Sequence, residues 1–71
     1  MPIVEYKAKA VVRALNRKGF VETMVNGDHH KFKSPDGRVT VVPYSKLGDT
    51  IYTGTLQAIL RQAGISKKDL K

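Results

Sequence analysis

Both histidines of this 71-residue chain stand side by side, in the stretch VNGDHHKFK at residues 25–33. Histidine is the usual proton-transfer residue near neutral pH and a common metal ligand, so the pair could serve as core residues, as metal ligands or as a catalyst beside a packed neighbour. A metal site needs three or four convergent ligands, whereas adjacent residues of a strand point to opposite faces, and the chain has no cysteine. The spacing therefore predicts no metal site and no cofactor.

The alternation of side chains along a strand separates the two histidines. An Asn-Gly dipeptide, the usual signal for a tight hairpin turn, directly precedes Asp28 and indicates that the following residues form the second strand of a hairpin. Phe32 is the residue there that most needs burial, and His30 shares its face. We therefore predict that His30 packs with Phe32 against the core, and that the solvent face carries His29, Lys31 and Lys33.

A histidine beside lysines can cleave RNA without a metal ion. The ribose 2′-hydroxyl is an internal nucleophile, so cleavage needs a base that is active near neutral pH, a cation that stabilises the charge on the phosphorane, and correct positioning. His29 with Lys31 or Lys33 would supply the base and the cation. The alternative at this point is that His29 is an ordinary surface histidine.

The charge of the chain favours a polyanionic partner. There are 13 Lys and Arg residues against 6 Asp and Glu residues, a formal net charge of +7, which suggests nucleic acid or an acidic protein. The length predicts one small domain, residues 1–71, without a deep substrate cavity. No segment has the apolar length of a signal peptide or of a membrane span, so we expect a soluble cytoplasmic protein.

Apolar spacing predicts an α+β fold in the order helix, strand, strand, strand, helix. Helical periodicity extends over 6–18, with Lys9, Arg13 and Arg17 on the polar side and an ending at Gly19. Strands are expected at 20–25, 29–33 and 38–42, with a turn at 34–37. Residues 43–54 are predicted to be a connecting loop.

A second amphipathic helix is predicted over 55–65, with Thr53 or Thr55 as its N-cap and an ending at Gly64. Residues 66–71 either add one helical turn or fray. Two apolar helix stripes and one sheet face are buried most simply when both helices lie on the same side of a three-stranded antiparallel sheet. The other sheet face is then left for water or for a partner.

Four stretches, taken in this order and at this spacing, resemble a known family. They are Arg17 to Phe20, Gly27 to Phe32, the Ser34-Pro35-Asp36-Gly37 turn followed by Val39 to Pro43, and Gly54 to Gly64. The chain resembles the HicA (YcfA-like) toxins of bacterial HicA–HicB toxin-antitoxin modules over nearly its whole length. The resemblance implies a fold similar to the double-stranded RNA-binding domain, α-β-β-β-α.

The resemblance also implies a function. It implies an endoribonuclease (mRNA interferase) that cleaves mRNA without a metal ion, arrests translation and is silenced by a HicB-like antitoxin in a hetero-oligomer. The family's catalytic histidine stands two positions after a glycine, with an aromatic residue three positions further on, a pattern that falls on Gly27, His29 and Phe32. Lys31 and Lys33 are then predicted to orient phosphate. Further RNA contacts are predicted at Lys9, Arg13, Arg17 and Arg38.

Two positions depart from the family's pattern. Asp28 stands where members often have Ser or Gly, and Thr53 where they often have Pro. Two other functions are open: a non-catalytic RNA-binding module of the double-stranded RNA-binding type, and a small basic subunit that binds an acidic protein. The last predicted helix has no basic residue before Arg61, which disfavours the first of these.

Overall fold

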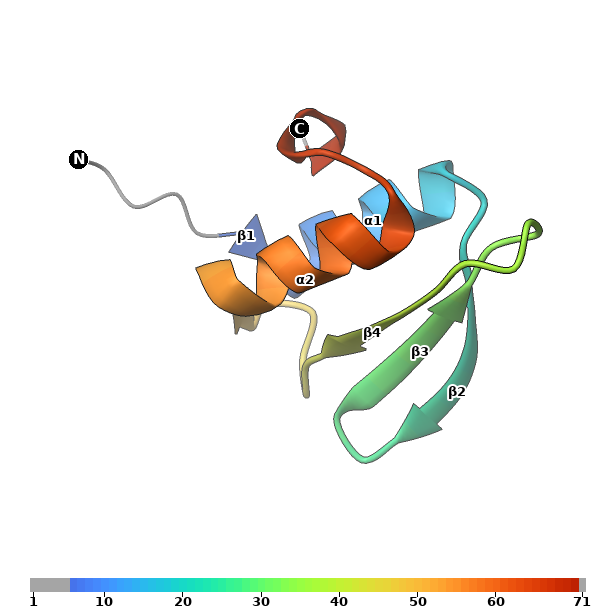
Figure 1. The fold of residues 1–71 in the computed structure, drawn as a ribbon. Helices are drawn as coiled ribbons and strands as arrows, with labels where there is room; N and C mark the ends of the chain where they lie inside the picture. Colours follow the sequence, from blue (N-terminus) through green and yellow to red (C-terminus); the bar gives the residue numbers. More distant parts are fainter. Residues whose placement is uncertain (1–5, 71) are drawn as a thin grey trace.

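The computed structural model describes residues 6–70 of the chain (Figure 1). Two helices cover one face of a three-stranded antiparallel sheet, and a short two-stranded pair joins the starts of the helices. This confirms the predicted α+β fold with its helix, three strands and helix. The elements are β1 (Tyr6–Lys7), α1 (Ala8–Arg17), β2 (Val21–Asn26), β3 (His29–Lys33), β4 (Val39–Pro43), β5 (Thr50–Ile51), α2 (Thr53–Ala63) and the 3₁₀ turn η1 (Lys67–Leu70).

Helix α1 begins at Ala8 rather than at Tyr6, because the backbone before it pairs elsewhere. Tyr6 and Lys7 form β1, which lies antiparallel to β5 with Tyr6 opposite Ile51. The predictions of a helix over Tyr6 and Lys7 and of a loop throughout 43–54 are therefore wrong at these residues. The partner strand is distant in the sequence, so local spacing carried no sign of the pairing.

The first amide groups of α1 donate to the loop that precedes β5. The Ala8 amide lies 2.8 Å from the Asp49 carbonyl oxygen, and the Lys9 amide lies 2.9 Å from that of Leu47. These bonds satisfy donors that a helix N-terminus otherwise leaves unpaired. The loop is thereby fixed against the start of α1.

Both helices end as the sequence predicts. Gly19 has φ +91° and Gly64 has φ +69°, values of the left-handed region that favour glycine. The amide of Phe20 donates to the Leu15 carbonyl at 2.9 Å, and that of Ile65 donates to the Leu60 carbonyl at 3.0 Å. Each bond closes the last helical turn and brings an apolar side chain back over it.

Helix α2 begins earlier than predicted and has no side-chain cap. It starts at Thr53, with Tyr52 in the N-cap position and no capping hydrogen bond from a side chain. The prediction of Thr53 or Thr55 as the N-cap is therefore wrong. Strand β5 ends at Ile51, so the chain enters the helix at once, and the amide of Leu56 donates to the Tyr52 carbonyl at 2.8 Å.

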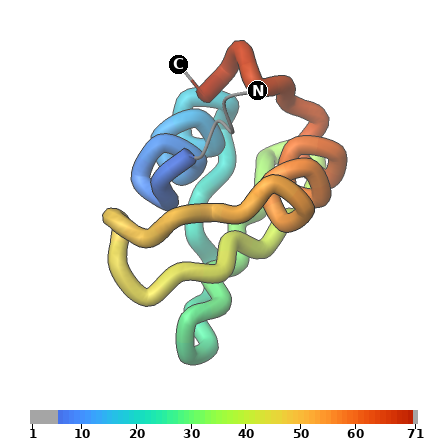
Figure 2. Tube along the Cα trace, turned by 90° about the vertical axis from the view of Figure 1, so that its left-hand side faces the viewer, coloured from blue at the N-terminus to red at the C-terminus, as the bar shows by residue number. Residues whose placement is uncertain are grey.

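The strands β2, β3 and β4 form an antiparallel meander in that order. A β-bulge at Thr23 interrupts the pairing of β2 with β3, between Glu22 and Met24. The β2–β3 hairpin extends beyond the helices (Figure 2), and residues 26–29 at its tip are exposed. The predicted turn between β3 and β4 is closed by a 3.0 Å bond from the Gly37 amide to the Ser34 carbonyl.

The core lies between the helices and one face of the meander. Phe32 of β3 and Val42 of β4 come from the sheet, and both are at most 1% exposed. The buried hydroxyl of Thr40 donates to the side-chain carbonyl of Gln62 at 2.9 Å, which ties β4 to α2. The remaining buried apolar residues are Ala8, Val11, Ala14, Leu15, Phe20, Ile51, Leu56, Ile59, Leu60, Ala63 and Leu70.

Candidate functional site

The hairpin between β2 and β3 carries both histidines. Gly27 has φ +63°, and an added Cβ would meet nothing within 4 Å, so glycine is required there by backbone conformation and not by lack of space. Asn26 and His29 are directly paired across the turn. The carbonyl of Asp28 accepts a 2.7 Å hydrogen bond from the amide of Tyr44, which anchors the turn to the segment after β4.

His29 lies on the side of the sheet away from the helices, as alternation predicts. Its side chain is 66% exposed, and its Nδ1 lies 3.2 Å from a carboxylate oxygen of Asp28. Its Nε2 has no partner among residues 6–70. A carboxylate on one ring nitrogen orients an imidazole and leaves the other nitrogen to exchange a proton with a ligand.

His30 has the opposite environment, and its prediction as the packed histidine is confirmed. Its side chain is 14% exposed, and its Nδ1 lies 2.6 Å from a carboxylate oxygen of Glu22. Its Nε2 donates to the carbonyl oxygen of Tyr44 at 2.9 Å. The ring stacks on that of Tyr44, with centroids 3.7 Å apart and planes 7° from parallel. Both nitrogens of His30 are therefore occupied within the fold.

The sheet surface around His29, termed the open face, combines aliphatic and cationic side chains in three rows. Paired residues share a face, so the register places Lys33 between Val21 and Val39, and Lys31 between Met24 and Val41. The four flanking aliphatic residues are 38% to 61% exposed. The open face consists of Val21, Met24, Asn26, His29, Lys31, Lys33, Val39, Val41 and Pro43.

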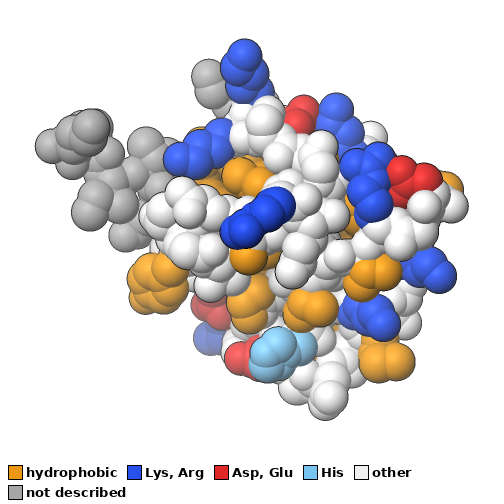
Figure 3. Space-filling view, in the orientation of Figure 1, with side chains coloured by type: hydrophobic (Ala, Val, Ile, Leu, Met, Phe, Trp, Pro, Cys, Tyr) orange, Lys and Arg blue, Asp and Glu red, His pale blue; other side chains and the backbone are white. Residues whose placement is uncertain are grey.

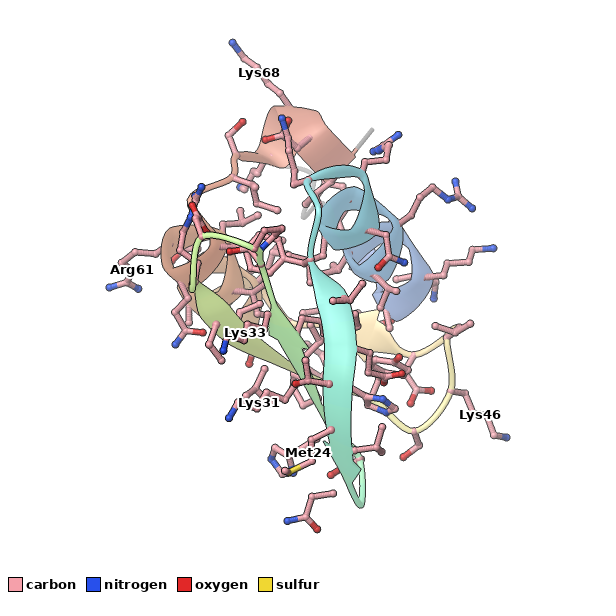
Figure 4. All side chains as sticks on the ribbon, turned by 90° about the vertical axis from the view of Figure 1, so that its right-hand side faces the viewer. Met24, Lys31, Lys33, Lys46, Arg61 and Lys68 are labelled. Atoms are coloured by element: carbon pink, nitrogen blue, oxygen red, sulfur yellow. The ribbon has the colours of Figure 1, made fainter. Side chains whose placement is uncertain are left out.

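A third cation lies on the same side of the molecule. In Figure 4, Met24, Lys31, Lys33 and Arg61 point to one side, and Lys46 points to the other. Figure 3 shows basic and hydrophobic side chains interspersed over this part of the surface, with histidine at its lower edge. Arg61 belongs to the last turn of α2 and was not among the predicted RNA contacts, because sequence spacing did not show which side of the fold it faces.

The predicted contacts on α1 form a separate surface. Lys9, Arg13 and Arg17 line an open groove of about 490 Å³ together with Leu47, which follows Lys46 in the loop before β5. Arg17 also donates to the backbone carbonyl of Asp69 at 2.6 Å. The structure thus places these three cations on the helix side of the fold, apart from Lys31 and Lys33.

Arg38 binds within the fold. Its guanidinium contacts the Asp36 carboxylate at 2.8 Å through Nε and at 2.7 Å through a terminal nitrogen. Its other terminal nitrogen donates to the Ala63 carbonyl at 2.9 Å, at the C-terminal end of α2 where a cation is favoured. The hydrogen bond from Arg38, followed by that from the Ser34 hydroxyl, holds the pKa of Asp36 well below its usual range. The Asp36 carboxylate in turn raises the pKa of Arg38.

Across residues 6–70, no three His, Asp or Glu side chains come together as a possible metal site. Within the same span, neither helix is long and apolar enough to cross a bilayer.

Comparison with protein families matches residues 8–65 to the family described as the HicA toxin of bacterial toxin-antitoxin. This chain belongs to the HicA toxin family. The match extends from the start of α1 to Ile65, and it includes the hairpin, the whole open face and α2. A search of the curated proteins finds no match. A HicA toxin is the toxin of a toxin-antitoxin module, so an antitoxin is its partner.

Sequence reasoning found the histidines of this HicA toxin but missed the residues that bind His30. Glu22 and Tyr44 lie on different segments and meet only through the pairing of β2 with β3 and the turn of the chain after β4. The only sign of this contact in the sequence was a carboxylate, Glu22, in the strand that the hairpin turn joins to the strand of the histidines. Burial, followed by the charge of Glu22, raises the pKa of the Tyr44 phenol, which is a further mark of how closely the cluster packs.

Proposed function

We propose that this HicA toxin is a metal-independent endoribonuclease that cleaves mRNA with His29 as its catalytic residue. The observation that carries the proposal is the open face itself. It holds His29, whose Nε2 has no partner in the described part of the chain, on the same surface as Lys31 and Lys33. No other histidine in the chain offers a ring nitrogen to a substrate, because His30 uses both of its own.

The proposed reaction uses the 2′-hydroxyl of RNA as the nucleophile. Nε2 of His29 accepts the proton of this hydroxyl while the 2′-oxygen forms a bond to phosphorus. The bond from phosphorus to the 5′-oxygen then breaks, and the leaving oxygen takes a proton from Lys31, Lys33 or water. The products are a 2′,3′-cyclic phosphate and a 5′-hydroxyl. The Asp28 carboxylate, 3.2 Å from Nδ1 of His29, is proposed to orient the ring so that Nε2 faces the substrate.

The lysines of the open face supply the positive charge. Lys31 and Lys33 are proposed to bind phosphate oxygens and to stabilise the charge that develops on phosphorus. Arg61 extends this cationic surface from α2, on the same side of the molecule. Further RNA contacts are proposed at Lys9, Arg13, Arg17 and Arg38. The first three lie on the helix side, and Arg38 is bound to Asp36 and Ala63.

The antitoxin is proposed to be HicB-like and to cover the open face in the cytoplasm. The lysines there would attract carboxylates, and the exposed valines and Met24 would contact apolar side chains of the partner. Coverage of this face would hide His29 and the lysines together, so RNA and antitoxin would compete for one surface.

The test uses purified wild-type protein, His29→Ala and a matched surface control, Lys46→Ala, whose side chain points away from the open face. A long single-stranded RNA and a DNA of the same sequence are incubated with each protein in EDTA. We expect wild type and Lys46→Ala to cleave RNA but not DNA, and His29→Ala to lose cleavage with an unchanged melting temperature. Expression in cells should arrest growth for the same two proteins.

Other outcomes identify other functions. If His29→Ala still cleaves, the catalytic assignment is wrong. If wild type binds RNA but does not cleave it, the protein is a non-catalytic RNA-binding module, a reading that its α-β-β-β-α order also permits. If wild type neither binds nor cleaves RNA, a basic subunit that binds only an acidic protein is the better account.

A further inference from the structure

His30 joins three segments of the chain at one point. It belongs to β3, its Nδ1 meets the carboxylate of Glu22 from β2, and its Nε2 meets the carbonyl of Tyr44 from the segment after β4. Glu22 is directly opposite Phe32, so its side chain reaches His30 as a diagonal neighbour across the two strands. The ring of Tyr44 covers the imidazole from one side.

The acceptor types fix which groups donate. A carbonyl oxygen only accepts, so Nε2 of His30 carries the proton of its bond to Tyr44. An ionised carboxylate also only accepts, so the bond to Glu22 forms fully when Nδ1 carries a proton as well. The separation of 2.6 Å between Nδ1 and the Glu22 oxygen is that of a direct hydrogen bond.

Tyr44 holds both chain neighbours of His29. Its amide donates to the Asp28 carbonyl at 2.7 Å, and its own carbonyl accepts from the His30 ring at 2.9 Å. Asp28 and His30 flank His29 in the chain, so the backbone of His29 is fixed on both sides by one residue. The hairpin tip extends beyond the helices, and these bonds supply contacts there that the core does not (Figure 2).

A purely apolar role does not account for this cluster. Packing alone would be met by an aliphatic side chain at position 30, which would need neither Glu22 nor the Tyr44 carbonyl. The hydrogen bonds have directions, and together they define where the strand end lies with respect to the segment after β4. Directional contacts of this kind are what a reacting group needs, because misplacement by about 1 Å can reduce a rate by about 100-fold.

We propose that His30, Glu22 and Tyr44 form a positioning unit that fixes His29 for the cleavage of RNA, an inference that rests on the catalytic role proposed for His29. His30 acts through its neighbour and does not touch the substrate. Loss of His30 should therefore lower kcat, whereas RNA binding depends on the lysines of the open face.

The test uses two variants. His30→Phe keeps a ring stacked on Tyr44 but loses both hydrogen bonds, and it leaves His29 as the single histidine, whose ring signals are then read without overlap by NMR. Glu22→Gln keeps the length of an exposed side chain and removes its charge, so it tests the unit even if His30→Phe fails to fold. Gln57→Ala, on the exposed side of α2, is the control.

Two measurements are made on each folded protein: kcat and KM for RNA cleavage, and amide hydrogen exchange at Tyr44. We expect kcat to fall by about 10- to 100-fold in His30→Phe and by less in Glu22→Gln, with KM unchanged within about twofold. Exchange at Tyr44 should accelerate by about tenfold while the amides of α2 keep their protection. Gln57→Ala should match wild type in both measurements.

Several results would overturn the inference. Full kcat in a folded His30→Phe protein would do so, as would unchanged exchange at Tyr44, and a raised KM with normal kcat would assign the cluster to RNA binding instead. If wild type itself does not cleave RNA, the proposed function fails. The exchange rate at Tyr44 then decides by itself whether the cluster fixes the strand end.

Discussion

The two faces of the β2-β3-β4 sheet are made by alternate residues of the same strands, and they differ in almost every property. The side toward the helices buries Phe32, Thr40 and Val42 completely, with the one polar group among them bonded to Gln62. The open face exposes Lys31 and Val41, which are direct sequence neighbours of those core residues. In each strand, alternate residues thus stabilise the core, and the residues between them remain available to a partner.

The adjacent histidines repeat this contrast on a smaller scale. His30 has both ring nitrogens bound and a ring stacked against it, whereas His29 has one carboxylate neighbour and a free edge. The same residue type is thus a structural group on one face and a candidate catalyst on the other. The first two of the following predictions compare the two faces directly.

The largest difference in stability should be that between the single variants Phe32→Ala and Lys31→Ala. Removal of a fully buried aromatic side chain costs about 3 to 5 kcal/mol, most of the stability of a domain this small. An exposed lysine outside any network should change the free energy of unfolding by less than about 0.5 kcal/mol. Urea denaturation followed by circular dichroism measures both. Similar losses of unfolding free energy in the two variants would show that the two faces contribute equally to stability.

A smaller effect is expected for the neighbouring pair Thr40→Val and Val41→Thr. Thr40→Val keeps the shape of a buried side chain but loses its bond to Gln62, a cost of about 1 kcal/mol. Val41→Thr changes an exposed position of the open face and should cost less than about 0.5 kcal/mol. Thermal unfolding of the two proteins gives the comparison. A greater loss for Val41→Thr would contradict the assignment of the faces.

Lys31→Gln and Lys33→Gln should weaken RNA binding and leave the fold unchanged. Each removes one proposed phosphate contact, so the slope of log affinity against log salt concentration should fall by about 0.7 for a single-stranded RNA. Lys46→Gln is the matched control on the other side of the molecule. Fluorescence anisotropy over a salt series measures the slopes. Equal slopes for all three variants would mean that the open face does not bind phosphate.

The smallest effect concerns acid pH and the turn between β3 and β4. Hydrogen bonds from Arg38 and then Ser34 keep the pKa of Asp36 below its ordinary value of 3.8. A group whose pKa is lowered by folding contributes stability that is present above its unfolded pKa and is lost as the pH falls through the folded one. Stability should therefore decline below about pH 4, and less steeply in Asp36→Asn. Identical acid slopes in urea titrations of the two proteins would exclude this contribution.

Much of the fold could be predicted from the sequence because its signals are local. Helical spacing, the Asn-Gly turn and the glycines at 19 and 64 gave the order of the main elements, and alternation gave the faces of β3. The pairing of β1 with β5, the clamp of Arg38 on the end of α2 and the contacts of His30 all join distant segments. Composition and local spacing do not indicate contacts between segments that are distant in the sequence.

The same reason explains what was missed near the candidate site. Alternation assigned His29 and His30 to opposite faces, but it could not supply Glu22 or Tyr44 as partners of His30. Nor could it show that Arg61 faces the same side as the lysines, since that depends on how α2 is rotated against the sheet.

The bulge at Thr23 has a consequence for the toxin when its partner is gone. All six residues of β2 are exposed, and one edge of this strand has no partner strand among residues 6–70. Such an edge is a template on which a second copy of the chain could add its own strand. The bulge breaks the regular repeat of amide and carbonyl groups and increases the local twist, which makes a poor template for strand addition. The bulge therefore disfavours the addition of a strand from a second copy at this edge.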